Sequence, residues 1–357
     1  MAKSSGLGRP TYVGVLACAV SMALSTLTLA QSSAASKPEE AAAQEAPLEV
    51  YTGPHIKKLD RPSFPLGELH NEGWVELAFM VDPNGKPFEV TVVRSTGNKT
   101  FETTALKAVE NSIFEPGTLN GKPVEAGYEL KYMFTMDRID PGARSDFIKA
   151  YKALLAAVNA GDRAAADAAL QQMTVKNLYE DAYFGVANYI YATKWGDDTQ
   201  QLESLRRAIA RESTAHYLPQ SMFRTALLSC MQLELKTHQY AEAMTTWKRL
   251  QKSGIDKDTT RLLESKVAQL EKLQADDSAY EVSGVITEKN WLLHLFKPHF
   301  SAVVSEGSIS EARLRCDKHY VFFAFDTSMQ YRVNSKDGKC SLEFVGTPGT
   351  RFKLIQF

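Results

Sequence analysis

The chain has 357 residues, more than one ordinary domain needs, so two or three domains are expected. A hydrophobic content of 44% and a charged content of 23% are typical of globular proteins and exclude a disordered tail or a polytopic membrane protein. The 41 Lys and Arg residues nearly balance the 42 Asp and Glu residues, and no strongly basic segment is visible. We therefore expect no nucleic-acid partner, because binding to a phosphate backbone requires concentrated positive charge.

The N-terminus has the features of a secretory signal peptide. A basic start precedes an apolar run at residues 12–29, and small residues lead to Ala30 before the polar Gln31. This pattern predicts residues 1–30 as a signal peptide that is cleaved between Ala30 and Gln31. The alternative is that residues 12–29 remain as an inner-membrane anchor, because the run is just long enough to span a bilayer. Only in that case do we expect membrane contact.

Residues 31–49 contain Ala, Ser, Glu, Gln and Lys with few large apolar residues, which predicts a flexible linker. Residues 50–138 have mixed β and α patterns. Two alternating runs, 74–82 and 88–92, flank the turn sequence Asp82-Pro83-Asn84-Gly85 and predict a hairpin with one apolar face per strand. Thr100 is a candidate cap for a helix whose apolar stripe runs from Phe101 to Ile113, and residues 128–136 alternate again. Three strands and a helix predict an antiparallel sheet covered on one side by that helix.

The order and spacing of several motifs in residues 62–136 resemble those of the TonB C-terminal domain. The matching motifs are Phe64-Pro65, Gly73-Trp74-Val75, Phe79-Met80-Val81-Asp82, Asn84-Gly85, Phe114-Glu115-Pro116 and Gly121-Lys122-Pro123-Val124. The resemblance implies a periplasmic domain of a Gram-negative bacterium that binds a short peptide of an outer-membrane receptor as an added strand. The peptide-binding candidates that it implies are Phe64 and Pro65 near the sheet edge and, in the last strand, Tyr128, Leu130, Tyr132 and Phe134. Strand addition is physically reasonable because an edge strand offers unpaired backbone groups.

Residues 144–276 are rich in Ala and Leu and predict an all-α domain, with helices over 146–160, 162–173, 178–193 and 202–211 and further helices up to Leu273. Gly161-Asp162 and Gly196-Asp197 each precede a helix, 35 residues apart, close to the period of tetratricopeptide (TPR) helix pairs. A plain helical bundle fits the pattern equally well. The basic run Lys248, Arg249 and Lys252 is interpreted as a solvated helix face.

Residues 279–357 predict a small all-β domain, either a barrel or a sandwich, from six short strands separated by turns. Cys316 and Cys340 lie 24 residues apart in this region, and in an exported protein this spacing predicts a disulfide. Cys230 lies in a helical apolar pattern and is expected to be a buried free thiol.

Motifs for catalysis or for metal and cofactor binding are missing from the sequence. There is no nucleophile elbow, zinc-protease helix motif, phosphate-binding loop or paired-cysteine motif. The best metal candidates are His294, His299 and His319, but their spacing matches no ligand motif, so we expect no metal, no cofactor and no enzymatic activity.

Two functions remain open. The first is an exported TonB-family protein, non-enzymatic, that binds outer-membrane receptor peptides in TonB-linked transport. The alternative is a periplasmic scaffold that uses TonB-like and TPR-like modules to bind envelope proteins without energy transduction. This alternative arises because more than 200 residues follow the TonB-like segment, where the usual transducer ends.

Overall fold

The computed structural model describes residues 50–136, 142–210, 217–288 and 290–357. The described part contains an N-terminal α+β domain, an all-α domain and a C-terminal all-β domain, as the sequence predicted. The predicted signal peptide (1–30), its cleavage site and the predicted linker (31–49) lie outside the described residues.

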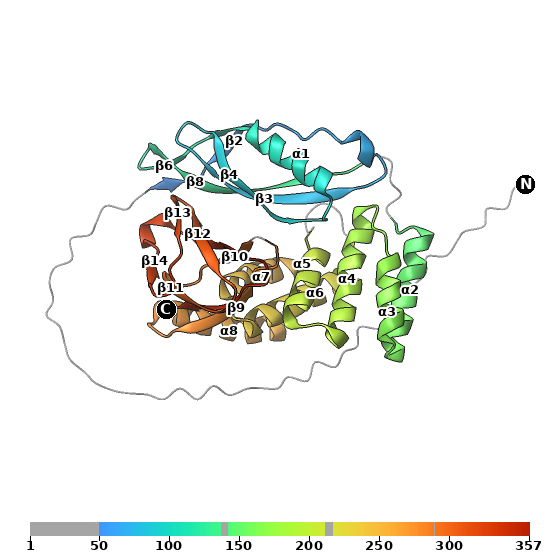
Figure 1. The fold of residues 1–357 in the computed structure, drawn as a ribbon. Coiled ribbons are helices and arrows are strands. Elements are labelled where there is room, and N and C mark those ends of the chain that lie inside the picture. Colours follow the sequence, from blue (N-terminus) through green and yellow to red (C-terminus); the bar gives the residue numbers. More distant parts are fainter. Residues whose placement is uncertain (1–49, 137–141, 211–216, 289) are drawn as a thin grey trace, which may run out of the picture. The chain divides into compact units, whose positions relative to one another are not determined.

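The N-terminal domain is built on a three-stranded antiparallel sheet of order β4-β3-β8, with helix α1 across one face (Figure 1). Short strands and a 3-10 helix flank it. The elements are β1 (Tyr51–Thr52), β2 (His55–Lys58), η1 (Leu66–Glu68), β3 (Gly73–Val81), β4 (Pro87–Ser95), α1 (Lys99–Glu110), β5 (Ile113–Glu115), β6 (Gly117–Leu119), β7 (Lys122–Val124) and β8 (Ala126–Phe134).

The predicted hairpin is confirmed: β3 pairs with β4 across the turn, and Gly85 has the positive φ of 83° that this turn requires. The helix cap is one correction, because Asn98, not Thr100, accepts hydrogen bonds from the first backbone N–H groups of α1. The apolar stripe ends at Val109, since Ile113 belongs to β5 and is 43% exposed.

Strand β3 departs from the expected single apolar face, because nearly all of its side chains are buried. Val75, Leu77, Phe79 and Val81 pack with α1 in the core of the N-terminal domain. On the opposite face Trp74, Ala78 and Met80 are also buried, at 2%, 7% and 0% exposure. The second face of the sheet is therefore covered by other parts of the chain.

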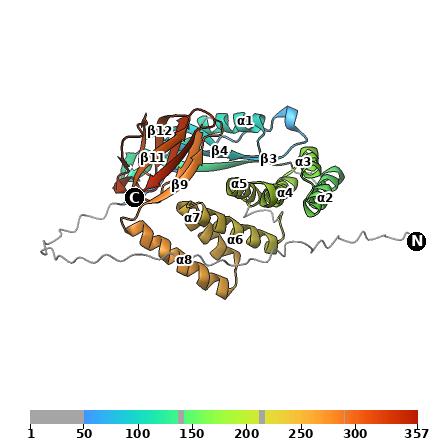
Figure 2. The same cartoon turned by 60° about the horizontal axis from the view of Figure 1, so that its bottom comes forward.

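The helical domain consists of consecutive helices that pack side by side, as Figure 2 shows for α6, α7 and α8. Gly161 ends α2 in the left-handed conformation, and Asp162 and Asp197 cap the next helices. Each Gly-Asp pair thus precedes a helix, as predicted, but α5 begins at Asp198, four residues before the predicted start. The helices are α2 (Ser145–Ala160), α3 (Arg163–Gln172), α4 (Leu178–Trp195), α5 (Asp198–Ala208), α6 (Gln220–Lys236), α7 (Tyr240–Ser253) and α8 (Lys257–Ala275).

The C-terminal domain consists of two four-stranded antiparallel sheets, of order β10-β15-β12-β13 and β14-β11-β16-β9. Phe344 of the first sheet packs edge-on against Phe352 of the second, with ring centroids 5.2 Å apart. The elements are β9 (Tyr280–Val285), β10 (Asn290–His294), β11 (His299–Glu306), β12 (Ile309–Cys316), β13 (Tyr320–Ala324), β14 (Tyr331–Arg332), η2 (Ser335–Asp337), β15 (Cys340–Gly346) and β16 (Arg351–Gln356).

The disulfide between Cys316 and Cys340 is present and joins β12 to β15. Cys230 is a buried free cysteine, and burial raises the pKa of its thiol to about 12.

Candidate peptide-binding edge and adjoining pocket

Strand β8 forms one edge of the N-terminal sheet and pairs with β3 over its whole length without a bulge. The backbone N–H of Gly127 points away from β3 and donates to the Asp317 carbonyl at 3.2 Å. Because N–H groups alternate in direction along a strand, those of Glu129, Lys131 and Met133 point to the same outer side. Residues 129–133 therefore present a regular row of backbone groups to an incoming strand.

The opposite edge, β4, is less suited to pairing. Its pairing with β3 contains two register shifts, and Glu89 has a positive φ of 51°. Bulges of this kind interrupt the backbone ladder and twist an edge away from partners. Strand β8 is thus the more regular of the two edges.

The residues implied by the family resemblance lie on or beside β8, with most of their side chains turned toward α1. Tyr132 and Phe134 are buried, and Phe64 packs on Phe134 with ring centroids 6.2 Å apart. Tyr128 and Leu130 are partly buried against the same core, and Pro65 directly precedes η1. These side chains hold β8 in place, so peptide recognition along this strand would use its backbone and its other face.

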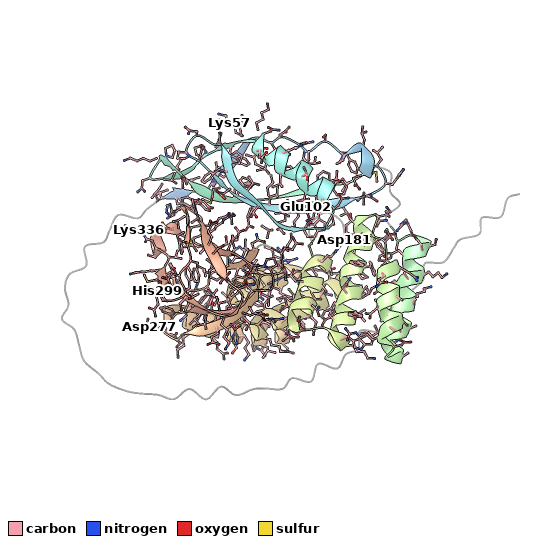
Figure 3. All side chains as sticks on the ribbon, in the orientation of Figure 1. Lys57, Glu102, Asp181, Asp277, His299 and Lys336 are labelled. Atoms are coloured by element: carbon pink, nitrogen blue, oxygen red, sulfur yellow. A yellow bond between two sulfur atoms is a disulfide. The ribbon has the colours of Figure 1, made fainter. Side chains whose placement is uncertain are left out.

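The other face of β8 and β3 meets a buried polar group that the sequence analysis did not identify. Trp74 donates its indole Nε1–H to Asp181 at 2.9 Å, and the Arg207 guanidinium forms an ion pair with the same carboxylate at 2.6 Å. Asp181 lies in the first turn of α4, near the sheet (Figure 3), and its side chain is only 4% exposed. The sequence hint was a tryptophan on the supposedly solvent-facing side of an alternating strand.

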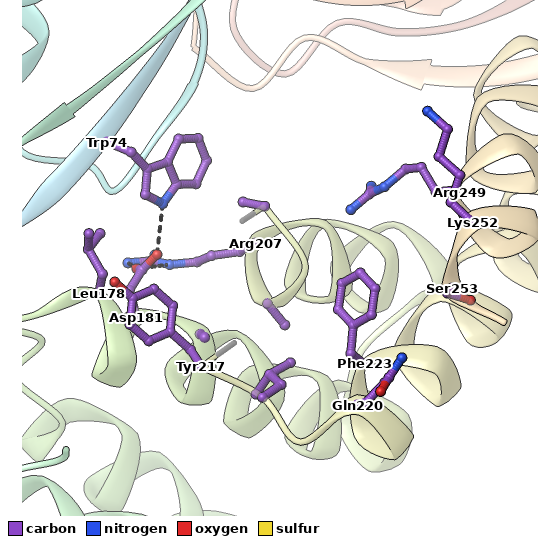
Figure 4. Close-up of a pocket in the computed structure, with 14 residues that line it drawn as sticks. Trp74, Leu178, Asp181, Arg207, Tyr217, Gln220, Phe223, Arg249, Lys252 and Ser253 are labelled. Atoms are coloured by element: carbon purple, nitrogen blue, oxygen red, sulfur yellow. Dashed lines mark hydrogen bonds and ion pairs between the residues drawn. The ribbon is translucent and has the colours of Figure 1, made fainter. Parts of the chain in front are cut away.

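A pocket of about 260 Å³ opens beside this group, between β3 and helices α4 to α7 (Figure 4). Its described charged lining residues are Arg207, Arg249, Lys252 and Asp181. Figure 4 shows Trp74 and Arg207 on one side, Arg249 and Lys252 on the other, and the Phe223 ring between the two sides. Of the basic run interpreted as a solvated face, Arg249 and Lys252 line this pocket. The lining is therefore basic and partly aromatic.

Lys131 connects β8 to the pocket. Its ammonium donates to the carbonyl of Ala210, a lining residue, at 3.0 Å and lies 5.1 Å from the centroid of the Trp74 ring. Burial lowers the pKa of Lys131, and the nearby Glu76 carboxylate, 3.6 Å from the ammonium, opposes that shift. The charge of Lys131, on the face of β8 opposite α1, therefore lies beside residues that line the pocket.

His294 of β10 lies between two carboxylates from different domains. Its Nε2 is 3.5 Å from Glu129 of β8, and its Nδ1 is 3.3 Å from Glu242 of α7. Hydrogen bonds to Glu129 and then Glu242 raise the pKa of His294 to about 10, so the imidazolium acts as a charged bridge between them.

No cluster of metal ligands occurs among the described residues. His299 stacks on Phe357 at 5.6 Å, and the backbone carbonyl of His319 accepts from Cys316. Of the three histidines named as the best metal candidates, His294 and His299 therefore have other side-chain partners.

Residues 67–136 match the family model of the Gram-negative bacterial TonB protein C-terminal. The N-terminal domain is TonB-like. A solution NMR structure of the TonB C-terminal domain of Pseudomonas aeruginosa is similar to this chain at 21% sequence identity, with a TM-score of 0.23. The similarity covers 25% of this chain and 92% of that one. No curated protein matches the chain.

The match confirms the resemblance and includes all of the β4-β3-β8 sheet and helix α1 of the TonB-like domain. None of the helices in the described part of the chain has the length and hydropathy needed to cross a membrane.

Proposed function

We propose that this chain is an exported, non-enzymatic protein of the Gram-negative cell envelope that binds an extended segment of a partner protein. The partner is an outer-membrane receptor or another envelope protein, and its segment adds to the TonB-like sheet along β8. The observation that carries the proposal is the unbroken outer edge of β8, where Glu129, Lys131 and Met133 direct their N–H groups outward.

Two settings are possible for this binding. In TonB-linked transport the chain stays tied to the inner membrane by residues 12–29. In a periplasmic scaffold the signal peptide is removed, and the TonB-like domain and TPR-like helices bind partners without energy transduction. The scaffold is supported by the burial of Trp74, Ala78 and Met80, which fixes the second face of the TonB-like sheet against the rest of the chain. Determining the N-terminal residue of the protein from a periplasmic fraction separates the two, since soluble protein that begins at Gln31 supports the scaffold.

Strand addition is tested at Met133. Met133→Pro deletes one outward N–H donor, and proline is tolerated on an edge strand when its nitrogen faces away from the sheet. Met133→Ala is the matched control, because it shortens the side chain and keeps the donor. We expect Met133→Pro to reduce peptide affinity at least tenfold while Met133→Ala changes it by less than about threefold, as measured by fluorescence anisotropy. Equal affinities in two folded variants would contradict pairing at this edge.

A further inference from the structure

The basic pocket lies close to Lys131 of β8, whose ammonium donates to the carbonyl of the lining residue Ala210. Helix α7 runs beside β8, because Glu242 of α7 shares His294 with Glu129 of β8. Further along, Arg249 of α7 and Lys131 of β8 donate to the neighbouring carbonyls of Ile209 and Ala210. Arg249 and Lys252, in the last turns of α7, line the pocket. The pocket is therefore next to the 131–134 end of β8.

An added strand would direct part of its side chains toward this pocket. Neighbouring strands lie about 4.8 Å apart, and successive side chains point to opposite faces of the sheet. Every second side chain of the peptide would lie on the same face as Lys131 and Trp74, whose ammonium and ring lie beside each other at the pocket. The remaining side chains would lie on the face covered by α1.

The charges around the pocket favour an acidic side chain. Asp181, the one acidic residue of the described lining, already accepts from Trp74 and pairs with Arg207. Lys252 is exposed at the rim, and Arg249 donates to the Ile209 carbonyl at 2.7 Å. A carboxylate fits this lining better than a neutral or basic group.

We propose that the pocket formed by Trp74, Arg207, Phe223, Arg249 and Lys252 receives an aspartate or glutamate side chain of the peptide that pairs with β8. This inference rests on the proposed strand addition and adds a sequence preference to it. The TonB-like sheet supplies affinity for any extended backbone, and the helical domain supplies selection for acidic segments.

The test is selection from a library of random seven-residue peptides on the full chain. Retained peptides are expected to be enriched in Asp or Glu at one position. One retained acidic peptide is then compared with its counterpart in which that residue is replaced by the matching amide. We expect the acidic form to bind roughly threefold to tenfold more tightly at low salt, and this advantage to shrink as ionic strength rises.

Lys252→Gln is the informative variant, and Lys248→Gln is its matched control. Both lysines are exposed on α7, but only Lys252 lines the pocket. Lys252→Gln should remove most of the advantage of the acidic peptide over the amide peptide, whereas Lys248→Gln should preserve that advantage. An equal loss in both variants would mean general charge attraction and would overturn the pocket assignment.

The outcomes also separate this inference from the proposed function. If no library peptide loses affinity in the Met133→Pro variant, strand addition itself is wrong, and the acidic preference with it. If peptides depend on Met133 but show no acidic enrichment, strand addition is supported and the pocket inference is overturned.

Discussion

Asp181 is a single residue that ties the TonB-like domain to the helical domain. Its carboxylate accepts from Trp74 of β3 and pairs with Arg207 of α5, which also donates to the Thr96 carbonyl at 3.3 Å. Burying a carboxylate is costly unless charged or polar donors compensate it, and here both kinds are present. Removing Trp74, Asp181 or Arg207 should therefore lower the free energy of unfolding more than removing one partner of an exposed ion pair.

Asp181→Asn is expected to lower the free energy of unfolding by about 2–3 kcal/mol, because it removes the charge that compensates the mostly buried Arg207. Asp258→Asn makes the same chemical change in an exposed pair with Arg261 and should cost less than about 1 kcal/mol. Urea unfolding of both variants measures the difference. Similar losses would show that the Asp181 ion pair adds little beyond a surface pair.

His294 makes the stability of the chain dependent on pH. Its pKa in the folded chain, about 10, lies above the ordinary value of 6.5, because hydrogen bonds to Glu129 and Glu242 favour the charged ring. A raised pKa stabilises the fold fully below pH 6.5, and this contribution is lost as the pH rises toward 10. The side chain is 46% exposed, so solvent screens part of the effect.

We therefore expect the urea concentration at the midpoint of unfolding to decrease as the pH is raised from 6.5 to 10. The His294→Gln variant should show a smaller decrease. The two carboxylates act at the other end of the pH range. The hydrogen bond from His294 lowers the pKa of Glu129 despite burial, so its contribution is present above pH 4.5 and is lost as the solution is acidified. A His294→Gln chain with the same alkaline fall as the parent would show that other groups cause it.

At the scale of elements, the sequence predicted the strands and helices best where one local pattern determined them. The β3–β4 hairpin follows from alternation and the Asp82–Gly85 turn, and the Gly161-Asp162 pair marks the boundary between α2 and α3. The burial of both faces of β3 could not be predicted in this way. It depends on Asp181 and Arg207, more than 100 residues away, and no local pattern encodes such a contact.

The candidate site, like the fold, was predictable only where a local sequence pattern determined it. The family resemblance located β8, but it implied side chains such as Tyr132 and Phe134 that the structure places in the core. The pocket combines residues from β3 and four helices, and the pairing of β8 with Asp317 involves a turn near the disulfide. The pocket and the contact between β8 and Asp317 both arise from tertiary packing, which cannot be predicted from periodicity or motif spacing.

Gly127 is where β8 meets the C-terminal domain. Its N–H donates to Asp317, and a Cβ at this position would lie 2.9 Å from the Cys316 carbonyl oxygen. Gly127→Ala should therefore push this turn away and lower the free energy of unfolding by about 1–3 kcal/mol. Gly67→Ala is the control, because nothing lies within 4 Å of its Cβ position. If chemical denaturation gave the two variants equal stability, the turn would not be held tightly against β8.

At the scale of the whole molecule, the described part of the chain has separate hydrophobic cores that do not follow the three domains. One core belongs to the TonB-like sheet and α1. A larger one is continuous from α5–α8 into both sheets of the C-terminal domain. Tyr240 of α7 packs on Tyr280 and Phe296 at 4.7 and 5.6 Å, and the buried Lys297 donates to the carbonyls of Asp276 and Ser278. Helices and strands in this core therefore depend on each other.

We expect helices α6 and α7 and strands β11 and β16 to unfold in one cooperative event, because separating them exposes a shared apolar core and breaks the Lys297 contacts. Native-state hydrogen exchange measured by mass spectrometry can test this, since amides that open only by the same unfolding report one common free energy. Peptides from these four elements should then exchange with similar protection. Those from α1 and β4, whose core is separate, are free to exchange at another rate. Strand β16 exchanging long before α7 would show that the apolar contacts between helices and sheets are too weak to couple them. The helical region would in that case be stable without the β domain, as an independent array of helices requires.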